Sequence, residues 1–330
     1  MRHLLPDHRP LDPLRPWRVR IACAATAVAL GVALGAVAWA PAVLAQAGPP
    51  GFTFLEVPTG ARAAALGGAF ATVAEGSDAA FWNPAGLAAT QRFQLGGAHT
   101  EYLQQLRHEA FALAIPVGGG GIAGSVRALY SEPIAARDEL GNEIGTFGAH
   151  DLEFGVAWGG RVSPTLRLGL GAQLVRERID QSAAMTYAFS VGTAWDPARW
   201  PTLRFALAAQ NLGPSPSFTI EDGEKGIPVP LPFAIQGGVR WLGPAIGTWQ
   251  SASSLETRFT RGRSGLGMFG FELSQPLGAA LRLGYRYNDD ATNLSIGGGW
   301  ATKALSLDYA FVPTRLELGD THRLSFATRF

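Results

Sequence analysis

Alternation between apolar and polar residues limits how this chain can fold more than any other feature. After the first quarter of the chain, alternating segments follow one another, and turn residues interrupt them regularly. In one segment Leu281, Leu283 and Tyr285 share a face, while Arg282 and Arg286 share the other. Successive side chains of a strand point to opposite faces, so the pattern predicts an array of β-strands.

Fourteen alternating segments are long enough to be strands. They are Arg92–Tyr102, His108–Val117, Ile122–Ser131, Asp151–Arg161, Leu166–Ile179, Met185–Trp195, Leu203–Leu212, Pro232–Leu242, Gly247–Phe259, Gly267–Leu277, Ala280–Asn288, Asn293–Thr302, Leu305–Val312 and Thr321–Phe330. An even number of strands is typical of a bacterial single-chain barrel.

Composition favours a membrane barrel over a soluble sandwich. Glycine accounts for 42 of 330 residues, charged residues for only 16% and hydrophobic residues for 47%. A membrane barrel has this profile because its lipid-facing residues occupy alternate positions, and its polar face lines the lumen. We therefore predict an all-β fold, in which residues 91–330 form a 14-stranded antiparallel transmembrane β-barrel in contact with outer-membrane lipid.

The first 45 residues have the pattern of a secretory signal peptide. An apolar region, Ile21–Trp39, follows several arginines, and Val43–Ala45 supplies small residues for cleavage before Gln46. The alternative is a membrane anchor helix, since the apolar region is long enough to span. Cys23, the only cysteine, lies in this leader, so the mature chain has no disulfide or thiol nucleophile.

The stretch from Gly60 to Leu87 is rich in small residues and does not alternate. It cannot be a strand of the array, and glycines on the predicted lumen face leave room for it. We predict that residues 46–90 form a small N-terminal plug inside the barrel. Its candidate functional residues are Arg62, Asp78, Asn83, Pro84, Ala85 and Gly86.

Local chemistry suggests how the plug residues act. Ser77 or Asp78 is placed to cap a short helix, and Pro84 ends that helix and favours an extended Asn83. Asn83 then reaches inward-facing groups of the strands. The charges of Arg62 and Asp78 require partners in a lumen. Two roles stay open: the motif folds the plug and seals the pore, or it gates the pore and contacts a ligand.

Loop lengths give the barrel a direction. Outer-membrane barrels have short periplasmic turns and longer extracellular loops, and the two longest gaps here, Glu132–His150 and Gly213–Leu231, both follow odd-numbered strands. Both are candidate partner-binding loops, and the alternative is that they only cap the barrel. The candidate residues in them are Glu132, Asp138, Glu221 and Asp222. The acidic run at 221–224 lacks the spacing of a dedicated calcium loop and is interpreted as a solvated tip.

The last segment ends the chain on an aromatic residue. Leu324, Phe326 and Phe330 share one face, and this pattern is similar to the signal that barrel-assembly machinery reads. The tryptophans of the array suit the aromatic girdles of a membrane barrel.

No catalytic or cofactor motif is present in the sequence. The four histidines after the leader lack zinc-ligand spacing, Gly118–Gly121 is not followed by the Lys-Ser/Thr of a phosphate loop, and no nucleophilic triad can be assembled. The formal net charge of +1 gives no electrostatic case for nucleic acid. We expect no enzyme activity, no metal and no cofactor.

Joint motifs resemble the PorV/PorQ family of outer-membrane proteins over about Phe52–Phe330. They are Ala61–Phe70, Asp78, Asn83–Leu87, Ala209–Gly213 before a loop that ends at Pro230–Pro232, Asp308–Phe311, and Leu318–Ser325. That family is similar to FadL-type transporters, which are fourteen-stranded barrels with an Asn-Pro-Ala plug motif. The resemblance implies that Asn83, Pro84 and Ala85 form the plug motif here.

The resemblance implies two functions. The first is a partner- or cargo-binding component of a type IX-like protein secretion system, with the translocon or secreted cargo as partner. It predicts a closed lumen and functional extracellular loops. The alternative is a FadL-like passive transporter of hydrophobic small molecules, which predicts an apolar pocket beside the plug.

Overall fold

The computed structural model describes residues 49–102, 106–219, 223–315 and 319–330. Within them, sixteen strands form one hydrogen-bonded sheet, and two more form a separate hairpin. The strands are β1 (Gln94–Glu101), β2 (Leu106–Val117), β3 (Gly120–Ser131), β4 (Ile134–Arg137), β5 (Glu143–Phe147), β6 (Ala149–Arg161), β7 (Leu166–Ile179), β8 (Ser182–Trp195), β9 (Leu203–Leu212), β10 (Ser217–Thr219), β11 (Lys225–Pro228), β12 (Ala234–Ile246), β13 (Trp249–Thr260), β14 (Leu266–Ser274), β15 (Ala279–Tyr287), β16 (Leu294–Ala301), β17 (Leu305–Val312) and β18 (Thr321–Arg329).

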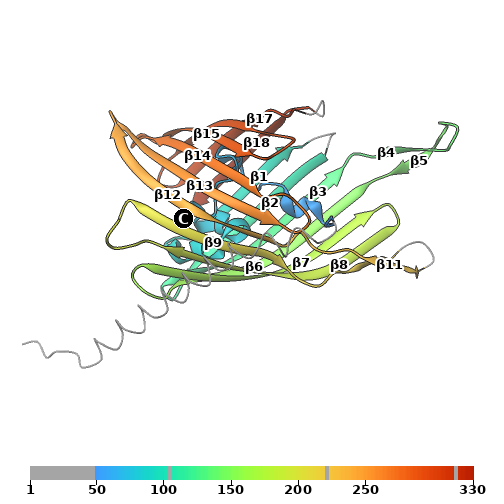
Figure 1. Cartoon of the computed structure of the whole chain (residues 1–330), viewed down its shortest axis with the longest axis horizontal. Coiled ribbons are helices and arrows are strands. Elements are labelled where there is room, and N and C mark those ends of the chain that lie inside the picture. Colours follow the sequence, from blue (N-terminus) through green and yellow to red (C-terminus); the bar gives the residue numbers. More distant parts are fainter. Residues whose placement is uncertain (1–48, 103–105, 220–222, 316–318) are drawn as a thin grey trace, which may run out of the picture. The chain divides into compact units, whose positions relative to one another are not determined.

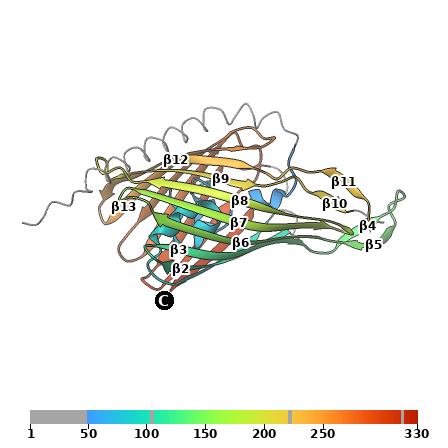
Figure 2. The ribbon, with the colours of Figure 1, turned by 90° about the horizontal axis from the view of Figure 1, so that it is seen from below.

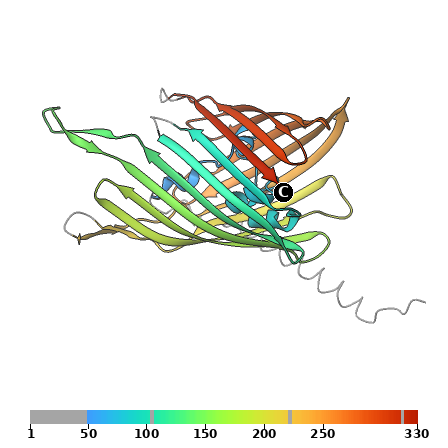
Figure 3. The ribbon, with the colours of Figure 1, turned by 180° about the vertical axis from the view of Figure 1, so that it is seen from behind.

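The sheet closes on itself. Among the described residues, β10 and β11 form a hairpin beside β8, and the other fourteen strands make a complete antiparallel ring because β8 also pairs with β9. The first and last strands are neighbours, in register from Gln94–Arg329 to Glu101–His322, and Figure 3 shows red β18 beside the first strands. The predicted 14-stranded antiparallel barrel is confirmed.

The two faces of the strands follow the predicted alternation. On β15, Leu281, Leu283 and Tyr285 are exposed on the outer wall, whereas Arg282 is buried in the lumen. The inner face is lined by polar, charged and glycine residues, and the outer face by large apolar ones. This polarity is inverted relative to a soluble protein and matches a barrel that faces lipid.

The two ends of the barrel differ, and we name them by their connections. At the short-turn end the connections include Gly118–Gly119 and Val162–Thr165, and at the long-loop end the hairpins β4–β5 and β10–β11 extend the wall. Figure 2 shows both hairpins at the same end. The six tryptophans of the wall lie on the short-turn half of their strands or in its turns, at Trp158, Trp195, Trp200, Trp241, Trp249 and Trp300.

The two long loops contain strands of their own. Residues within Glu132–His150 pair as β4–β5, and residues within Gly213–Leu231 pair as β10–β11, so both loops satisfy backbone groups internally. The predicted boundary between the strands Pro232–Leu242 and Gly247–Phe259 is wrong. β12 continues through a register shift after Leu242, and the chain reverses at Gly247, whose positive φ of 62° suits glycine.

The plug lies inside this barrel (Figure 1). Its short helices are η1 (Thr53–Glu56), α2 (Ala61–Ala65), η2 (Gly76–Asp78), α3 (Ala79–Trp82) and η3 (Pro84–Ala89). Small residues let these one- or two-turn helices pack against the wall, and Ala61, Ala85 and Leu87 are fully buried. None of the helices in the described ranges is long and apolar enough to cross a membrane.

Candidate functional site

The candidate site is the contact between the plug and the barrel wall. The plug begins at the long-loop end, where the Gly51 amide donates to Pro230 O (3.1 Å). It ends at the short-turn end, where Thr90 lies beside Gly121. The inner face carries glycines where the plug touches it: a Cβ added to Gly169 would collide with Pro84, and one added to Gly192 with Asn83. The wall is therefore shaped to this segment.

Asn83 joins the two halves of the plug to the wall. Its backbone is extended (φ −156°, ψ 103°), and Pro84 follows as the first residue of η3. Its side-chain Nδ2 donates to Ala71 O (3.0 Å) and to Thr193 O on β8 (3.2 Å). Its Oδ1 accepts from the Ala85 amide (3.1 Å). A single amide thus connects the plug, the start of η3 and a strand.

Arg62 holds α2 to the wall through a buried ion-pair network. Its guanidinium donates Nε and Nη2 to the two oxygens of Glu272 on β14, at 2.9 and 2.8 Å. Glu272 also accepts from Arg282 (2.6 Å), and Arg282 donates to Asp308 (2.7 Å). Burial alone would lower the pKa of Arg62, but the Glu272 carboxylate raises it above its ordinary value.

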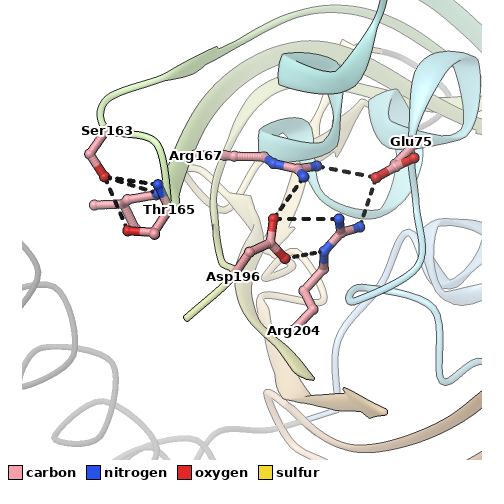
Figure 4. Close-up of polar contacts among 7 residues, drawn as sticks. Glu75, Ser163, Thr165, Arg167, Asp196 and Arg204 are labelled. Carbon is pink, nitrogen blue, oxygen red and sulfur yellow. Dashed lines mark hydrogen bonds and ion pairs between the residues drawn. The ribbon is translucent and has the colours of Figure 1, made fainter. Parts of the chain in front are cut away.

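A second network holds the plug at the short-turn end (Figure 4). Glu75 accepts from Arg167 (3.1 Å) and Arg204 (2.7 Å), and both arginines also donate to Asp196, at 2.7 and 2.6 Å. Two cations and two anions alternate, so their charges balance. Burial would raise the pKa of Glu75, but Arg204 and Arg167 hold it below its ordinary value. The second network thus secures the plug at this end.

A third contact fixes the middle of the plug with a fully buried carboxylate. Glu256 on β13 accepts from the amides of Ala71 (3.0 Å) and Thr72 (2.9 Å), and from Thr72 Oγ1 (2.7 Å). Gln236 on β12 donates a fourth bond (2.7 Å). Donors alone compensate this carboxylate, since no ion pair to it is formed by the described residues.

The long-loop half of the lumen contains an apolar cluster. Phe52, Phe54 and Leu55 of the plug pack with Val175, Ala184, Ala188 and Leu231, and Phe52 stacks on Phe218 at a centroid distance of 5.9 Å. Leu231 and Phe218 belong to the long connection between β9 and β12. The cluster is therefore built jointly by the plug, the wall and this connection.

A small polar cavity lies beside the plug, between Thr59, Trp82, Arg127, Gln210 and Arg258, with a volume of about 20 Å³. That is room for about one water molecule.

The structure places the other predicted residues as follows. Asp78 precedes α3 but makes no capping bond, so the predicted side-chain cap is wrong. Burial raises the pKa of Asp78 to about 6, with Arg62 acting in the opposite direction. Gly86 is buried against the backbone of Ala74, and an added Cβ would collide with it. Asn83–Gly86 thus lie together at the start of η3, whereas Arg62 is held separately by Glu272.

The predicted aromatic face of β18 points outward. Leu324 is exposed, Phe326 lies over Gly97, and Phe330 packs edge-on against Phe93 at 5.6 Å. This pair of rings closes the seam between the first and last strands at the short-turn end.

Two of the predicted loop residues, Glu132 and Asp138, lie at the long-loop end and bond to residues of the wall and of the β4–β5 hairpin. Glu132 pairs with Arg107 (2.8 Å), and both side chains are exposed. Asp138 organises the tip of β4–β5, where its Oδ1 accepts from the amides of Leu140 (2.9 Å) and Asn142 (2.8 Å). Glu221 and Asp222 lie outside the described residues.

Sequence reasoning missed Glu256 and Glu272, which contact the plug from the wall. Both occupy inward positions of alternating strands, and a carboxylate buried there requires donors or a cation. That requirement is the signal that would have found them.

A plugged, closed barrel of fourteen antiparallel strands is the architecture of FadL-like outer-membrane barrels, and comparison with solved structures shows the same fold. The chain is similar to the toluene transporter TbuX of Ralstonia pickettii (13% identity, TM-score 0.55, 82% of this chain and 98% of that chain covered). It is similar to the toluene transporter TodX of Pseudomonas putida (11%, 0.56, 82% and 98%). A FadL homologue of Pseudomonas aeruginosa also matches (12%, 0.51, 83% and 99%). At such identities the likeness establishes the fold alone.

Sequence comparison gives less. The profile of an uncharacterised protein family, UPF0164, matches residues 33–152. No curated protein matches the chain. The similarity to FadL-like barrels is thus confirmed, whereas the resemblance to the PorV/PorQ family stays a prediction.

Proposed function

We propose that this protein is an outer-membrane barrel through which hydrophobic small molecules cross the membrane passively. The observation that carries the proposal is the apolar cluster of Phe52, Phe54, Leu231 and Phe218 at the long-loop end of the lumen. Apolar and aromatic side chains line most small-molecule sites, so this cluster suits an apolar ligand better than a water-filled pore does. In this proposal the long-loop end is extracellular, and the short-turn end, with its tryptophan girdle, is periplasmic.

The proposal includes the division of the chain. Residues 1–45, which lie outside the described residues, would be the export signal, residues 46–90 the plug and residues 91–330 the barrel. The fold shared with two solved toluene transporters supports the transport function. The ligand class we propose is a small apolar molecule, received first at the cluster.

Leu231 provides a direct test. Leu231→Asp places a charge in the apolar cluster, while Leu277→Asp makes the same change at an exposed turn of the short-turn end. In cells that lack other hydrocarbon transporters, uptake of radiolabelled toluene should fall to background with Leu231→Asp and stay at wild-type level with Leu277→Asp. Both proteins must first be found folded in the outer membrane by their heat-modifiable gel mobility, and Leu231→Ala serves if the charge prevents folding. Equal uptake with and without the wild-type protein would refute the function.

A specific observation also favours a second candidate, a partner-binding component of protein secretion. Exposed apolar side chains lie on both extended hairpins: Leu140 and Ile144 near β4–β5, and Ile227 on β11. Exposed apolar residues at a protein's edge often mark protein contacts. Copurification from native membranes tests this candidate: a stoichiometric protein partner that Leu140→Asp releases would support it, and recovery of the barrel alone would count against it.

A further inference from the structure

Two acidic residues face each other across neighbouring strands at the long-loop end of the lumen. Asp151 on β6 and Glu177 on β7 are direct cross-strand partners, which brings their Cβ atoms to about 5 Å. Asp151 is only 9% exposed, and its Oδ1 has no hydrogen-bond partner. Glu177 Oε2 is likewise buried and unpartnered. Like charges placed directly opposite each other destabilise a sheet unless something compensates them.

The described surroundings supply donors but no cation. The backbone amides of Arg178 and Phe52 lie near the carboxylates of Asp151 and Glu177, respectively, and favour their charged forms. Each carboxylate nevertheless has one buried oxygen without a hydrogen-bond partner. The lumenal arginine Arg127 is already paired with Glu153, which is two residues along β6. Glu177 acts repulsively on Asp151, and the described residues form no ion pair with either carboxylate.

The other nearby arginines face away. Arg176 and Arg178 flank Glu177 on β7 and are exposed on the outer wall, where Arg178 donates its Nε to Asp180 O (2.9 Å). They cannot reach the lumen from alternate positions of the same strand. The pair thus lacks two positive charges. The other carboxylates that hold the plug differ, because each is matched either by arginines or by four hydrogen-bond donors.

We propose that Asp151 and Glu177 bind a divalent cation, best fitted by Ca²⁺, at the extracellular end of the lumen. Two carboxylates supply hard oxygen ligands and two negative charges, and Ca²⁺ tolerates an irregular shell completed by water and backbone oxygens. No third His, Cys, Asp or Glu joins them within the described ranges. The affinity should therefore lie in the weak range of extracellular sites, about 10⁻⁴–10⁻³ M.

The position of this site gives the ion a role in the plug. The backbone amide of Phe52, the first plug residue in the apolar cluster, lies near the carboxylate of Glu177. An ion bridging β6 and β7 would hold Glu177 in place for that contact. The site concerns the stability of the start of the plug, so it does not depend on what the barrel transports.

Thermal unfolding of the purified barrel in detergent tests the site. After treatment with EDTA, addition of Ca²⁺ to about 10 mM should raise the Tm by about 2–4 °C, as expected for a weak site near saturation. Asp151→Asn and Glu177→Gln should abolish this rise. Glu132→Gln, which alters an exposed carboxylate at the same end of the barrel, should retain it.

Three outcomes would overturn the proposal. One is a wild-type Tm that Ca²⁺ and Mg²⁺ leave unchanged. Another is an equal rise in Asp151→Asn, which places the bound ion elsewhere. A third is a Tm, measured without metal, that falls from acid to neutral pH in the wild type but not in Asp151→Asn or Glu177→Gln. That result would show that the two carboxylates share a proton instead of binding an ion. Should the variants fail to assemble, hydrogen exchange of the wild type decides: Ca²⁺ should slow exchange at residues 149–153 and 175–179.

Discussion

Removing the charge of Glu272 should loosen the plug more than any other single substitution. Glu272→Gln keeps the shape of the side chain but leaves Arg62 without a carboxylate partner, whereas Arg282 keeps Asp308 at 2.7 Å. Breaking a buried ion pair costs about 3–5 kcal/mol. The Arg62 side chain is 32% exposed, so water compensates part of the loss, and we expect about 3 kcal/mol.

The assay is equilibrium unfolding of the refolded barrel in guanidinium chloride, followed by tryptophan fluorescence. Glu132→Gln is the matched control, because the Glu132–Arg107 pair has a similar distance of 2.8 Å but is exposed on both sides. Exposed pairs contribute about 0–1 kcal/mol. Hydrogen exchange adds a local measurement: amides of α2 should exchange faster in Glu272→Gln, and those of β6 should not.

The comparison of the two variants is decisive. If Glu272→Gln and Glu132→Gln lower the free energy of unfolding equally, burial does not strengthen the lumenal pair. If α2 exchanges at the wild-type rate in Glu272→Gln, the network does not hold the plug.

Three further predictions follow from the plug and the seam. Asn83→Ala should lower stability by about 1–3 kcal/mol in the same unfolding assay, because it removes the side-chain donor to the buried Ala71 O; an unchanged midpoint would contradict this. Burial raises the pKa of Asp78 to about 6, so the folded state binds its proton more tightly than the unfolded chain. The stability contribution should therefore fall as pH rises from about 4 to about 6, and a wild-type minus Asp78→Asn difference that stays constant over this range would refute it. Phe330→Ala, which removes the ring packed on Phe93, should reduce the heat-modifiable barrel found in membranes, and an unchanged amount would show that the terminal ring is dispensable.

The strand count and the facing of the strands could be predicted because they depend on local pattern. A period of two assigns Leu281 outward and Arg282 inward without knowledge of any neighbour. The hairpins β4–β5 and β10–β11 were missed because short exposed strands carry no apolar face. A hairpin of this kind depends on its turn. In β4–β5 the carboxylate of Asp138 accepts from the Asn142 amide and so organises the turn.

The plug contacts could not be predicted for a different reason. Arg62 and Glu272 are 210 residues apart, and they meet only because closure of the ring sets which inward position faces α2. The sequence pattern predicts that a lumenal charge has a partner, because a buried charge must be compensated. It does not predict which residue that partner is. The same reasoning identifies Asp151 and Glu177, where the ring brings two charges of one sign together and the described residues supply no counter-charge. In this proposal internal arginines hold the middle of the plug, and an external ion holds its start. When the ion is lost, the plug should loosen first at its start, beside the apolar cluster.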